Sequence, residues 1–575
     1  MNDKTTLTAV PISSLEKIFS DTDIGKIQTS EFSAMRNEPI NFQVAYRLEH
    51  ADNPRVHIGV EVISDIPVSL YSIKSVPLSH INDIGSDEPF HELHPDILIP
   101  KKTNPEFVEG YGNGASDFAR FEKDDLAPLY ASDLCSQALW ITINEEGKRL
   151  QAGTYPVTFR FFKMESKEDL GECTVTVRLI DALLPKQKTY CTNWFYCDCL
   201  ADYYDVPVFS DKFYEIFRSH VAVAAKNGMN MMLLPAFTPE LDTPVGQERM
   251  TVQLVKITME NDTYSFDFSE MKRFMDICRD CGITSFEHCH LYSQWGAEHA
   301  PKIIATVDGK EKQLFGWKTK AAGKKYKAFL DAYLPAVVAF FKEEGLDKKV
   351  LFHISDEPSV HHLKQYKLLA SMVKPHLSGQ MLGDALSHYD FYEQGTTDLP
   401  IIYTSKVKDF LGKCNHFWCY YTGSEGPAPR SNRLINTPSR CNRAIGYQMY
   451  YTRAEGFLHW GYNYYYDHLS FGIANPFITP ANYLAGKLGS SYLVYPGLKG
   501  RTYPSIRQKV FGEAMLDIRA LQLLERLGGR RCAEALVEKY FGQVDYETLP
   551  ESNEQLLAFR AELNNTICAL VEKRA

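Results

Sequence analysis

In the first third of the chain, apolar side chains recur at every second position, which is the period of a half-buried β-strand. The alternation is strict over residues 173–179, and residues 139–144 and 155–162 are two further strand candidates. Several such strands separated by turn-rich spacers predict a β-sandwich. We therefore expect an N-terminal β-sandwich accessory domain over residues 1–184, with a long loop at 104–127.

A polar junction at residues 185–188 marks a change of pattern. Beyond it, short apolar runs alternate with stretches of helical period, such as 212–225 and 324–344. Strands that alternate with helices predict a parallel sheet. Eight strand candidates predict that this sheet closes into a (β/α)8 TIM-like catalytic barrel over residues 185–500. The candidates are 189–196, 229–234, 284–290, 350–355, 380–386, 399–404, 416–421 and 456–461.

The end of the chain has a helical pattern throughout, with candidate helices at 504–527, 531–541 and 552–572. We expect this C-terminal helical region, residues 501–575, to pack on the side of the barrel. The predicted fold class is therefore α/β, a TIM-like barrel with an N-terminal β-sandwich domain and a C-terminal helical extension.

The composition narrows the range of partners. The chain has 575 residues, of which 44% are hydrophobic, so it can bury a large core in two or three domains. A net charge of -10 and a pI of about 6.0 disfavour a nucleic-acid partner and favour a neutral small molecule. We see neither a membrane-spanning run nor an apolar signal segment, so we expect a cytoplasmic protein without a membrane partner. The thirteen irregularly spaced cysteines are interpreted as reduced thiols.

The most informative segment is residues 350–358, VLFHISDEP, where a buried-strand pattern ends in two adjacent carboxylates and a proline. Barrel strands present catalytic groups at their carboxyl ends, which would place Asp356 and Glu357 on the rim. Two carboxylates held close together cannot both ionise at their ordinary pKa, so one stays protonated and can act as an acid. Glu357 is our candidate for that acid. The alternative is that Ser355 or Asp356 caps a helix beginning near Pro358.

A second cluster suggests metal chemistry. His288 and His290 would share one face of a strand, and some metallohydrolases build their sites from such a pair. Further ligands at suitable strand ends are not evident, and Cys278 and Cys281 belong to the helical pattern at 271–281, at the opposite end of the barrel strand. We therefore expect no metal and no other cofactor. A metal-dependent hydrolase that uses His288 and His290 remains an alternative.

Between about residues 190 and 530 the chain resembles the catalytic domain of glycoside hydrolase family 123, whose characterised members are exo-acting β-N-acetylgalactosaminidases. The resemblance rests on an ordered set of motifs, namely NWF at 193–195, SDEP at 355–358, GFLHW at 456–460 with Asn463, and YPSIR at 503–507. It implies a TIM barrel and a glycoside or oligosaccharide as the partner. Characterised members are typically exported, whereas this chain shows no export signal.

Carbohydrate binding requires flat aromatic faces for the C–H face of a pyranose and polar groups for its hydroxyls. Residues 460–467, WGYNYYYD, supply both at the end of the last predicted strand. We expect Trp460 to form the floor of the pocket, while Tyr465 and Tyr466 pack beneath the rim. The full set of candidate substrate-binding residues is Trp460, Asn463, Tyr464, Trp194, Trp295, Trp418, Tyr420, Tyr403 and Asp384. Four of these residues, Trp194, Trp295, Trp418 and Tyr420, could equally belong to the core.

The adjacency of the two carboxylates constrains the mechanism. Neighbouring Cα atoms are about 3.8 Å apart, so Asp356 and Glu357 project from one side of the cleft and cannot flank the anomeric carbon as a conventional pair does. This arrangement suits a substrate that brings its own nucleophile, the carbonyl oxygen of a 2-acetamido group. The resemblance implies the same, with Glu357 protonating the leaving oxygen, Asp356 orienting the acetamido N–H, and an oxazoline intermediate. Tyr403, Tyr420 or Tyr464 could supply a phenolic donor to the acetamido carbonyl.

We therefore expect a retaining exo-glycoside hydrolase that acts on terminal β-linked 2-acetamido-2-deoxy sugars, with N-acetylgalactosamine favoured. The alternatives are the metal-dependent hydrolase and a noncatalytic carbohydrate-binding protein. The sequence leaves the oligomeric state open.

Overall fold

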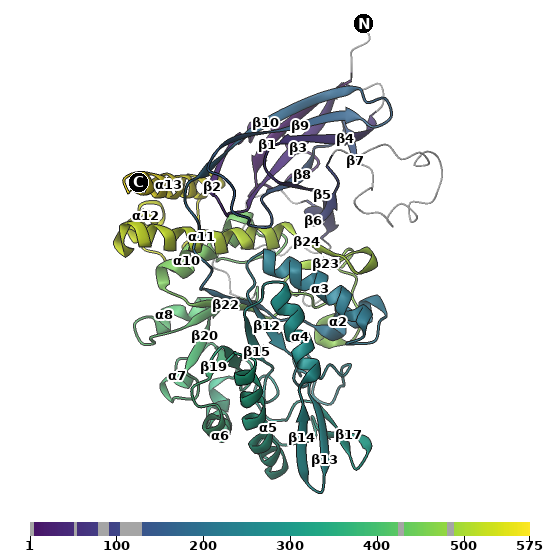
Figure 1. Cartoon of the computed structure of the whole chain (residues 1–575), viewed down its shortest axis with the longest axis vertical. Helices are drawn as coiled ribbons and strands as arrows, with labels where there is room; N and C mark the ends of the chain where they lie inside the picture. Colours follow the sequence, from purple (N-terminus) through teal and green to yellow (C-terminus); the bar gives the residue numbers. More distant parts are fainter. Residues whose placement is uncertain are drawn as a thin grey trace.

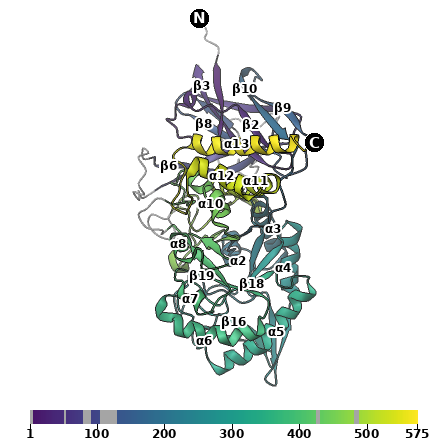
Figure 2. The same cartoon turned by 90° about the vertical axis from the view of Figure 1, so that its left-hand side faces the viewer.

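The N-terminal sheets lie at one end of the molecule, the barrel lies at the other, and the C-terminal helices lie between them (Figures 1 and 2). The computed structural model describes residues 5–50, 54–78, 91–103, 129–423, 430–479 and 488–574. The long loop expected at 104–127 lies outside the described residues. Within the described residues, no helix combines the length and the apolar character that crossing a membrane requires.

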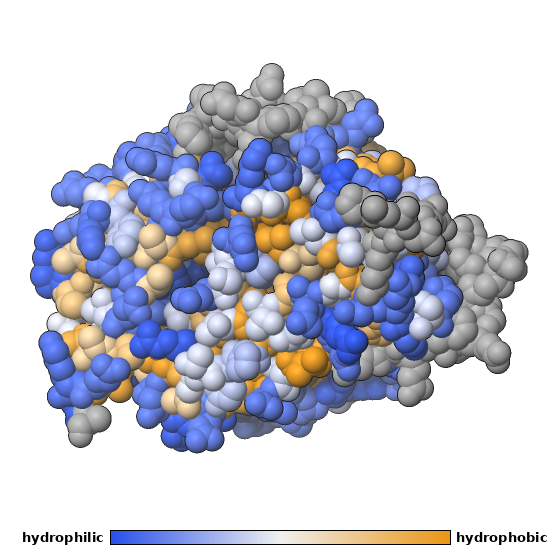
Figure 3. Space-filling view, turned by 90° about the horizontal axis from the view of Figure 1, so that it is seen from above, coloured by the Kyte–Doolittle hydropathy of each residue, from blue (hydrophilic) through white to orange (hydrophobic). Residues whose placement is uncertain are grey.

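The alternating segments before residue 181 form two five-stranded sheets that share an apolar core. Phe42 and Leu139 of the first sheet and Phe159 and Val177 of the second are all buried in that core. The first sheet has the order β1 (Thr6–Ser13), β3 (Ile40–His50), β8 (Gln137–Ile143), β5 (Val68–Pro77) and β6 (Leu93–Lys101). The second has the order β2 (Glu31–Met35), β10 (Asp169–Ile180), β9 (Gly153–Lys163), β4 (Arg55–Ser64) and β7 (Leu129–Ser132). Seen from this end, hydrophilic residues dominate the rim of the visible face, with apolar ones interspersed toward its middle (Figure 3).

Eight parallel strands form a closed barrel, which confirms the predicted mixed α/β fold with an eight-stranded barrel. The first and last strands pair with each other from Tyr190 opposite Gly456 to Asn193 opposite His459. Each strand lies inside one of the eight predicted segments, because short apolar runs buried on both faces are the signature of parallel strands. In order they are β11 (Tyr190–Asn193), β12 (Met231–Leu234), β15 (Ser285–His288), β18 (Val350–Phe352), β19 (Met381–Leu386), β20 (Leu399–Tyr403), β21 (Trp418–Tyr420) and β22 (Gly456–His459).

Helices and one additional sheet surround the barrel. The helices that connect barrel strands include α2 (Cys197–Tyr204), α3 (Asp211–Lys226), α4 (Ser269–Asp280), α5 (Lys324–Glu343), α6 (Leu363–Val373), α7 (Asp390–Glu393) and α8 (Val407–Phe410). The connections after β12 and β15 also contribute a four-stranded sheet that the sequence analysis did not identify. Its order is β14 (Thr263–Asp267), β13 (Lys256–Glu260), β16 (Ile303–Val307) and β17 (Lys310–Phe315).

The C-terminal helices join the barrel to the N-terminal sheets. They are α11 (Ile506–Gly528), α12 (Arg530–Phe541) and α13 (Asn553–Glu572), and a short hairpin of β23 (Val494–Pro496) and β24 (Thr502–Pro504) precedes α11. Two helices of the connection from β21 to β22, α9 (Ser439–Arg443) and α10 (Ile445–Thr452), pack against α11. Ser505 caps α11 by accepting a hydrogen bond from the backbone N–H of Gln508. Asp517 of α11 accepts hydrogen bonds from Arg443 at 2.7 and 2.9 Å and from Arg560 at 2.6 Å, and all three side chains are buried. Arg560 also pairs with Glu38 of the N-terminal region, so an ionic network holds these parts together.

Candidate active site

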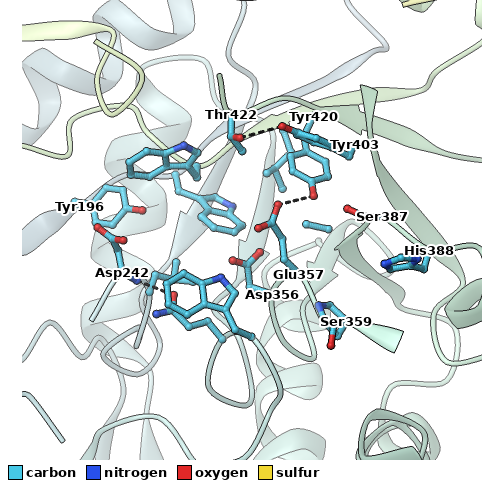
Figure 4. Close-up of a pocket in the computed structure, with 18 residues that line it drawn as sticks. Tyr196, Asp242, Asp356, Glu357, Ser359, Ser387, His388, Tyr403, Tyr420 and Thr422 are labelled. Atoms are coloured by element: carbon cyan, nitrogen blue, oxygen red, sulfur yellow. Dashed lines mark hydrogen bonds between the residues drawn. The ribbon is translucent and has the colours of Figure 1, made fainter. Parts of the chain in front are cut away.

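A cavity of about 460 Å³ opens at the carboxyl ends of the barrel strands (Figure 4). Seven of the eleven candidate residues line it, namely Trp194, Trp295, Asp356, Glu357, Tyr403, Tyr420 and Trp460. The sequence analysis did not select the other lining residues, which are Tyr196, Leu241, Asp242, Gln294, Pro358, Ser359, Ala385, Ser387, His388, Thr422 and Leu458. Aromatic rings and carboxylates therefore share one concave site, which is the composition that sugar binding requires.

Backbone hydrogen bonds beyond the end of β18 hold the acidic pair at the cavity. The N–H groups of Leu291 and Trp295 donate to the carbonyl oxygens of His353 and Asp356, at 3.0 and 2.9 Å. These bonds prolong the pairing of β15 with β18 past the regular strands. The Ser355 hydroxyl donates to the carbonyl of Ser293 at 2.7 Å, which fixes the residue before the pair.

The helix-cap alternative is wrong. The helix after the acidic pair is the 3-10 helix η3 (Val360–His362), and Ser359 forms its capping box. Asp356 and Glu357 both lie before that cap and line the cavity. In Figure 4 their carboxylates project from the same wall.

Glu357 is held in a defined orientation by a tyrosine from another strand. The Tyr420 hydroxyl, at the end of β21, donates to Glu357 Oε1 at 2.6 Å (Figure 4). Tyr420 is 3% exposed, and burial together with the neighbouring Glu357 carboxylate holds the pKa of its phenol well above the ordinary value. It therefore stays a hydrogen-bond donor at neutral pH. Tyr403 lies beside it, with its ring 5.0 Å from that of Tyr420.

Asp356 titrates abnormally. Burial raises its pKa well above the ordinary value, and the Glu357 carboxylate next to it raises the pKa further. Asp242 and Asp384 act in the same direction, while His353 opposes them. Asp356 therefore takes up a proton at a higher pH than an isolated aspartate does.

Three cavity residues adopt the left-handed backbone conformation that is uncommon outside glycine. Glu357 has φ of 43°, Asp242 has φ of 52° and Trp295 has φ of 55°. Each such position costs about 1–3 kcal/mol unless its surroundings enforce it, and positions of this kind cluster at functional sites. Their concentration around one cavity supports its functional assignment.

Asp242 is a functional candidate that the sequence analysis missed. It lies in the connection after β12, where its N–H donates to Gln294 Oε1 at 2.7 Å and its carbonyl accepts from the Ser470 hydroxyl at 2.9 Å. Figure 4 shows its carboxylate next to Tyr196, to the left of Asp356 and Glu357. The segment around it has no strand or helical period, so only its position after a barrel strand could have suggested it.

Four predicted binding residues lie outside the cavity lining. Asn463 is fully buried and bridges the backbone of Tyr196, accepting from its N–H at 2.8 Å and donating to its carbonyl at 3.1 Å. The Tyr464 hydroxyl donates to the carbonyl of Asp467 at 3.0 Å, and its ring packs 4.9 Å from that of Tyr196. Asn463 and Tyr464 therefore do not face the cavity. They support Tyr196, which forms part of its wall.

Trp418 and Asp384 point into the barrel interior. Trp418 stacks on Tyr190 at 5.0 Å, near the amino-terminal ends of the strands, and its ring occupies the space where a side chain at Gly456 would lie. The carboxylate of Asp384 accepts from the N–H of Ile354 at 2.9 and 3.2 Å. It therefore anchors the backbone just before the acidic pair.

A buried layer of charged residues lies beneath the cavity. His353 is fully buried, with Nε2 2.9 Å from Glu287 Oε2 and Nδ1 3.4 Å from Asp384 Oδ1. Burial alone would lower the pKa of His353, but hydrogen bonds to the two carboxylates outweigh it and raise the pKa to about 9. Glu287 also accepts from Trp194 Nε1 at 3.1 Å. The His353 imidazolium thus balances the charges of Glu287 and Asp384. Glu287 holds the side chain of Trp194, and Asp384 holds the backbone just before Asp356.

We expect His353→Ala to reduce the free energy of unfolding by about 3–5 kcal/mol, because it leaves two buried carboxylates without their cation. Urea denaturation measures this loss. His376→Gln is the matched control, since His376 pairs with Asp331 at 3.0 Å near the surface and such pairs contribute about 1 kcal/mol or less. Equal losses in the two variants would contradict the interpretation.

The proposed metal pair does not converge. His288 faces α5, where its Nε2 lies 2.8 Å from the Tyr333 hydroxyl, whereas His290 stacks on His353 at 4.7 Å inside the barrel. Regular strand alternation ends at His288, so the two rings do not share a face. Among the described residues, His290, His353 and Asp384 could bring one ligand atom each within 4.8 Å of one another. A metal ligand must be deprotonated, however, and the ion pairs of His353 favour its protonated form.

Comparison with known proteins identifies the family. A family model described as glycoside hydrolase 123, catalytic domain, matches residues 194–524, more than half of the chain. The chain belongs to glycoside hydrolase family 123. It is therefore a glycoside hydrolase, and the resemblance seen in the sequence is confirmed. No curated protein sequence matches it.

A solved structure shares the fold of this family 123 chain. A family 123 glycoside hydrolase from Clostridium perfringens, whose structural analysis concerned glycolipid glycan hydrolysis, aligns with a TM-score of 0.68 and 14% identity, covering 99% of each chain. At this identity the likeness shows a shared fold. A family 39 glycoside hydrolase from Bacteroides cellulosilyticus WH2 aligns with a TM-score of 0.31, 8% identity and coverage of 85% of this chain and 81% of the other. That score is too low to bear on the argument.

Proposed function

We propose that this family 123 hydrolase is a retaining exo-glycosidase that removes terminal β-linked 2-acetamido-2-deoxy sugars, with N-acetylgalactosamine favoured. The observation that carries the proposal is the projection of Asp356 and Glu357 from one wall of the cavity (Figure 4). A conventional retaining pair needs carboxyl groups on opposite faces of the ring, about 5–5.5 Å apart. A same-wall pair instead suits a substrate whose own amide supplies the nucleophile.

In the first step, the carbonyl oxygen of the acetamido group forms a bond to C1 as the bond between C1 and the leaving oxygen breaks. Glu357 gives its proton to that leaving oxygen. Asp356 accepts a hydrogen bond from the acetamido N–H and so stabilises the positive charge that develops on the oxazolinium ring. In the second step, Glu357 takes a proton from water, which adds to C1 and reopens the ring. Two inversions at C1 retain the configuration.

The aromatic walls support an assignment of the sugar-binding contacts. Trp194, Trp460 and Trp295 line the cavity, and Trp295 is 47% exposed, as a residue at an open rim would be. We propose that Trp194 and Trp460 cover the C–H face of the terminal sugar and that Trp295 contacts the leaving group. Among the three tyrosines considered for the acetamido carbonyl, Tyr464 is fully buried outside the lining, which favours Tyr403 and Tyr420.

Tyr420→Phe should lower kcat/KM about tenfold, because a hydrogen bond to an ionisable group is worth about 1.5–3 kcal/mol and orients the proton donor. Steady-state kinetics on an aryl 2-acetamido-2-deoxy-β-galactoside measures the effect. Tyr421→Phe is the control, since the adjacent Tyr421 packs against Phe457 on the outer side of the barrel. A change of less than twofold in Tyr420→Phe would remove Tyr420 from the mechanism.

A thiazoline mimic of the oxazoline tests the whole proposal. An enzyme that uses acetamido participation should bind this bicyclic compound at least 100-fold more tightly than free N-acetylgalactosamine, because the mimic resembles the transition state. Equal affinity for both would overturn the substrate-assisted mechanism. Comparison of aryl galactosides and glucosides that carry the same acetamido group tests the preferred sugar.

We also propose that three segments of the chain have different roles. The barrel of residues 185–500 would carry catalysis, the sheets of residues 1–184 would form a β-sandwich accessory domain, and residues 501–575 would connect the two. This arrangement is supported by the buried apolar contacts that α11 makes with the N-terminal sheets on one side and with the barrel on the other.

A further inference from the structure

We propose that Asp242 determines specificity by hydrogen-bonding a hydroxyl of the terminal sugar and, with Asp356 and Glu357, by excluding sugars that carry sulfate, phosphate or carboxylate groups. This inference rests on the proposed function, because it narrows the class of sugar that the same cavity accepts.

The charge of the cavity carries the first step of the argument. Asp242, Asp356 and Glu357 line it, and neither lysine nor arginine occurs among the described lining residues. Asp242 lies close enough to Asp356 to help raise the pKa of that residue, after burial and the Glu357 carboxylate. An anionic substituent would enter beside these acids without a compensating cation.

Two cations behind the walls, Arg249 and His353, are paired with carboxylates. Arg249 packs over the outer side of Tyr196, 5.4 Å from the ring centre, and its guanidinium pairs with Asp198 at 2.5 Å. Both side chains are buried, so this charge is neutralised locally. The His353 imidazolium beneath the cavity is likewise matched by Glu287 and Asp384. The lining also contains His388, whose side chain is exposed.

Asp242 is built into the wall as a fixed acceptor. Its backbone is clamped by Gln294 on one side and Ser470 on the other, in the left-handed conformation. The Tyr464 phenol lies beside its carboxylate, and burial followed by this carboxylate raises the pKa of that phenol far above the ordinary value. A carboxylate held rigidly at a cavity wall can accept a hydrogen bond from a sugar hydroxyl, which a neutral sugar offers and a sulfate ester at the same oxygen does not.

The test compares kcat/KM at pH 8 for 4-nitrophenyl β-glycosides of N-acetylgalactosamine that carry a hydroxyl, a methyl ether or a sulfate at O6, and the same series at O4. The methyl ethers control for bulk. We expect the sulfate at the more sensitive position to react at least about 100-fold more slowly than its methyl ether, because like charges a few ångströms apart repel strongly in an enclosed site. Rates within threefold of each other at both positions would overturn the inference.

Asp242→Asn assigns the effect to this residue. The sulfate-to-methyl-ether ratio of kcat/KM should rise at least tenfold, and a ratio does not depend on the fraction of protein that folds. Glu248→Gln is the control, since Glu248 pairs with Lys302 at 2.9 Å outside the cavity lining and should leave the ratio unchanged. An unchanged ratio in Asp242→Asn would remove Asp242 from specificity. Complete loss of turnover on every substrate would instead place it among the reacting groups and overturn the proposed role.

Binding separates this inference from the proposed function. Isothermal titration with free N-acetylgalactosamine and its 4- and 6-sulfates needs no catalysis. Selective binding of the neutral sugar without turnover of any glycoside would contradict the proposed function. It would still support the exclusion of anionic sugars from the cavity. Equal binding of neutral and sulfated sugars would contradict the exclusion of anionic sugars, whether or not turnover occurs.

Discussion

Replacing Glu357 by glutamine is expected to lower kcat/KM for an aryl 2-acetamido-2-deoxy-β-galactoside by about 10³-fold while leaving the fold intact. A positioned general acid contributes about 10²–10⁴-fold, and the amide cannot give up a proton to the leaving oxygen. Glutamine keeps an oxygen that can accept the bond from Tyr420, so the cavity should retain its shape. Steady-state kinetics with circular dichroism and thermal melting measure both parts of this expectation.

The leaving group distinguishes an acid from a merely structural residue. A 2,4-dinitrophenyl glycoside departs without protonation, so the loss in Glu357→Gln should be much smaller for that substrate in the first step. Glu455→Gln provides the control, because Glu455 pairs with His416 at 2.6 Å near the surface. Full activity in Glu357→Gln, or equal loss on both leaving groups, would refute the assignment of the acid.

Replacing Asp356 by asparagine should lower kcat by about 10²–10³-fold, the usual effect of removing one group that stabilises developing charge. The amide cannot offer a negative charge to the acetamido N–H as the oxazolinium forms. The variant should also lose most of its preference for the thiazoline over the free sugar. Asp398→Asn, which alters a surface pair with Lys374, is the control and should be neutral in both assays.

The same variant predicts a change in pH dependence. Because burial and Glu357 raise the pKa of Asp356, its carboxylate is lost by protonation at a higher pH than that of an ordinary aspartate. Activity of the unmodified enzyme should therefore fall on the acid side well above pH 4, and this limb should be absent in Asp356→Asn. An acid limb that persists unchanged in the variant would assign the titration to another group.

Stability should move in the opposite direction to activity. A group whose pKa is raised in the folded state costs stability when it is charged, so folding stability falls as pH rises through that pKa. Asp356→Asn should melt a few degrees higher than the unmodified protein at pH 8, and the difference should vanish as the pH drops. A lower melting temperature at pH 8 would show that the Asp356 charge is well compensated.

Several elements could be predicted because their signals are local. The eight barrel strands lie inside the predicted segments, since each is a short apolar run whose burial follows from the side chains themselves. Helix α12 was expected at 531–541 and spans Arg530–Phe541. The order of these elements predicts the barrel, and the barrel predicts that residues following β18 meet the site. This reasoning, together with the resemblance to the family, located Asp356 and Glu357.

Side-chain direction at the strand ends was not predictable in this way. The expected alternation placed His288 and His290 on one face, but β15 ends at His288 and the two rings point to different neighbours. Trp418 was expected at the pocket and instead fills space next to Gly456 inside the barrel. Glu357 reaches Tyr420 from a left-handed backbone position, and no periodic pattern specifies such a dihedral angle.

Hydrophobic period and motif order are properties of neighbouring residues, so they were enough to predict the barrel, the family and the chain position of the acidic pair. Tertiary structure alone decided which side chains meet. Asp242 and Glu357 are separated by more than a hundred residues, yet they line one cavity. Asp517, Arg443 and Arg560 form one buried network in the same manner. Such contacts depend on the packing of whole elements against each other, which local pattern does not encode.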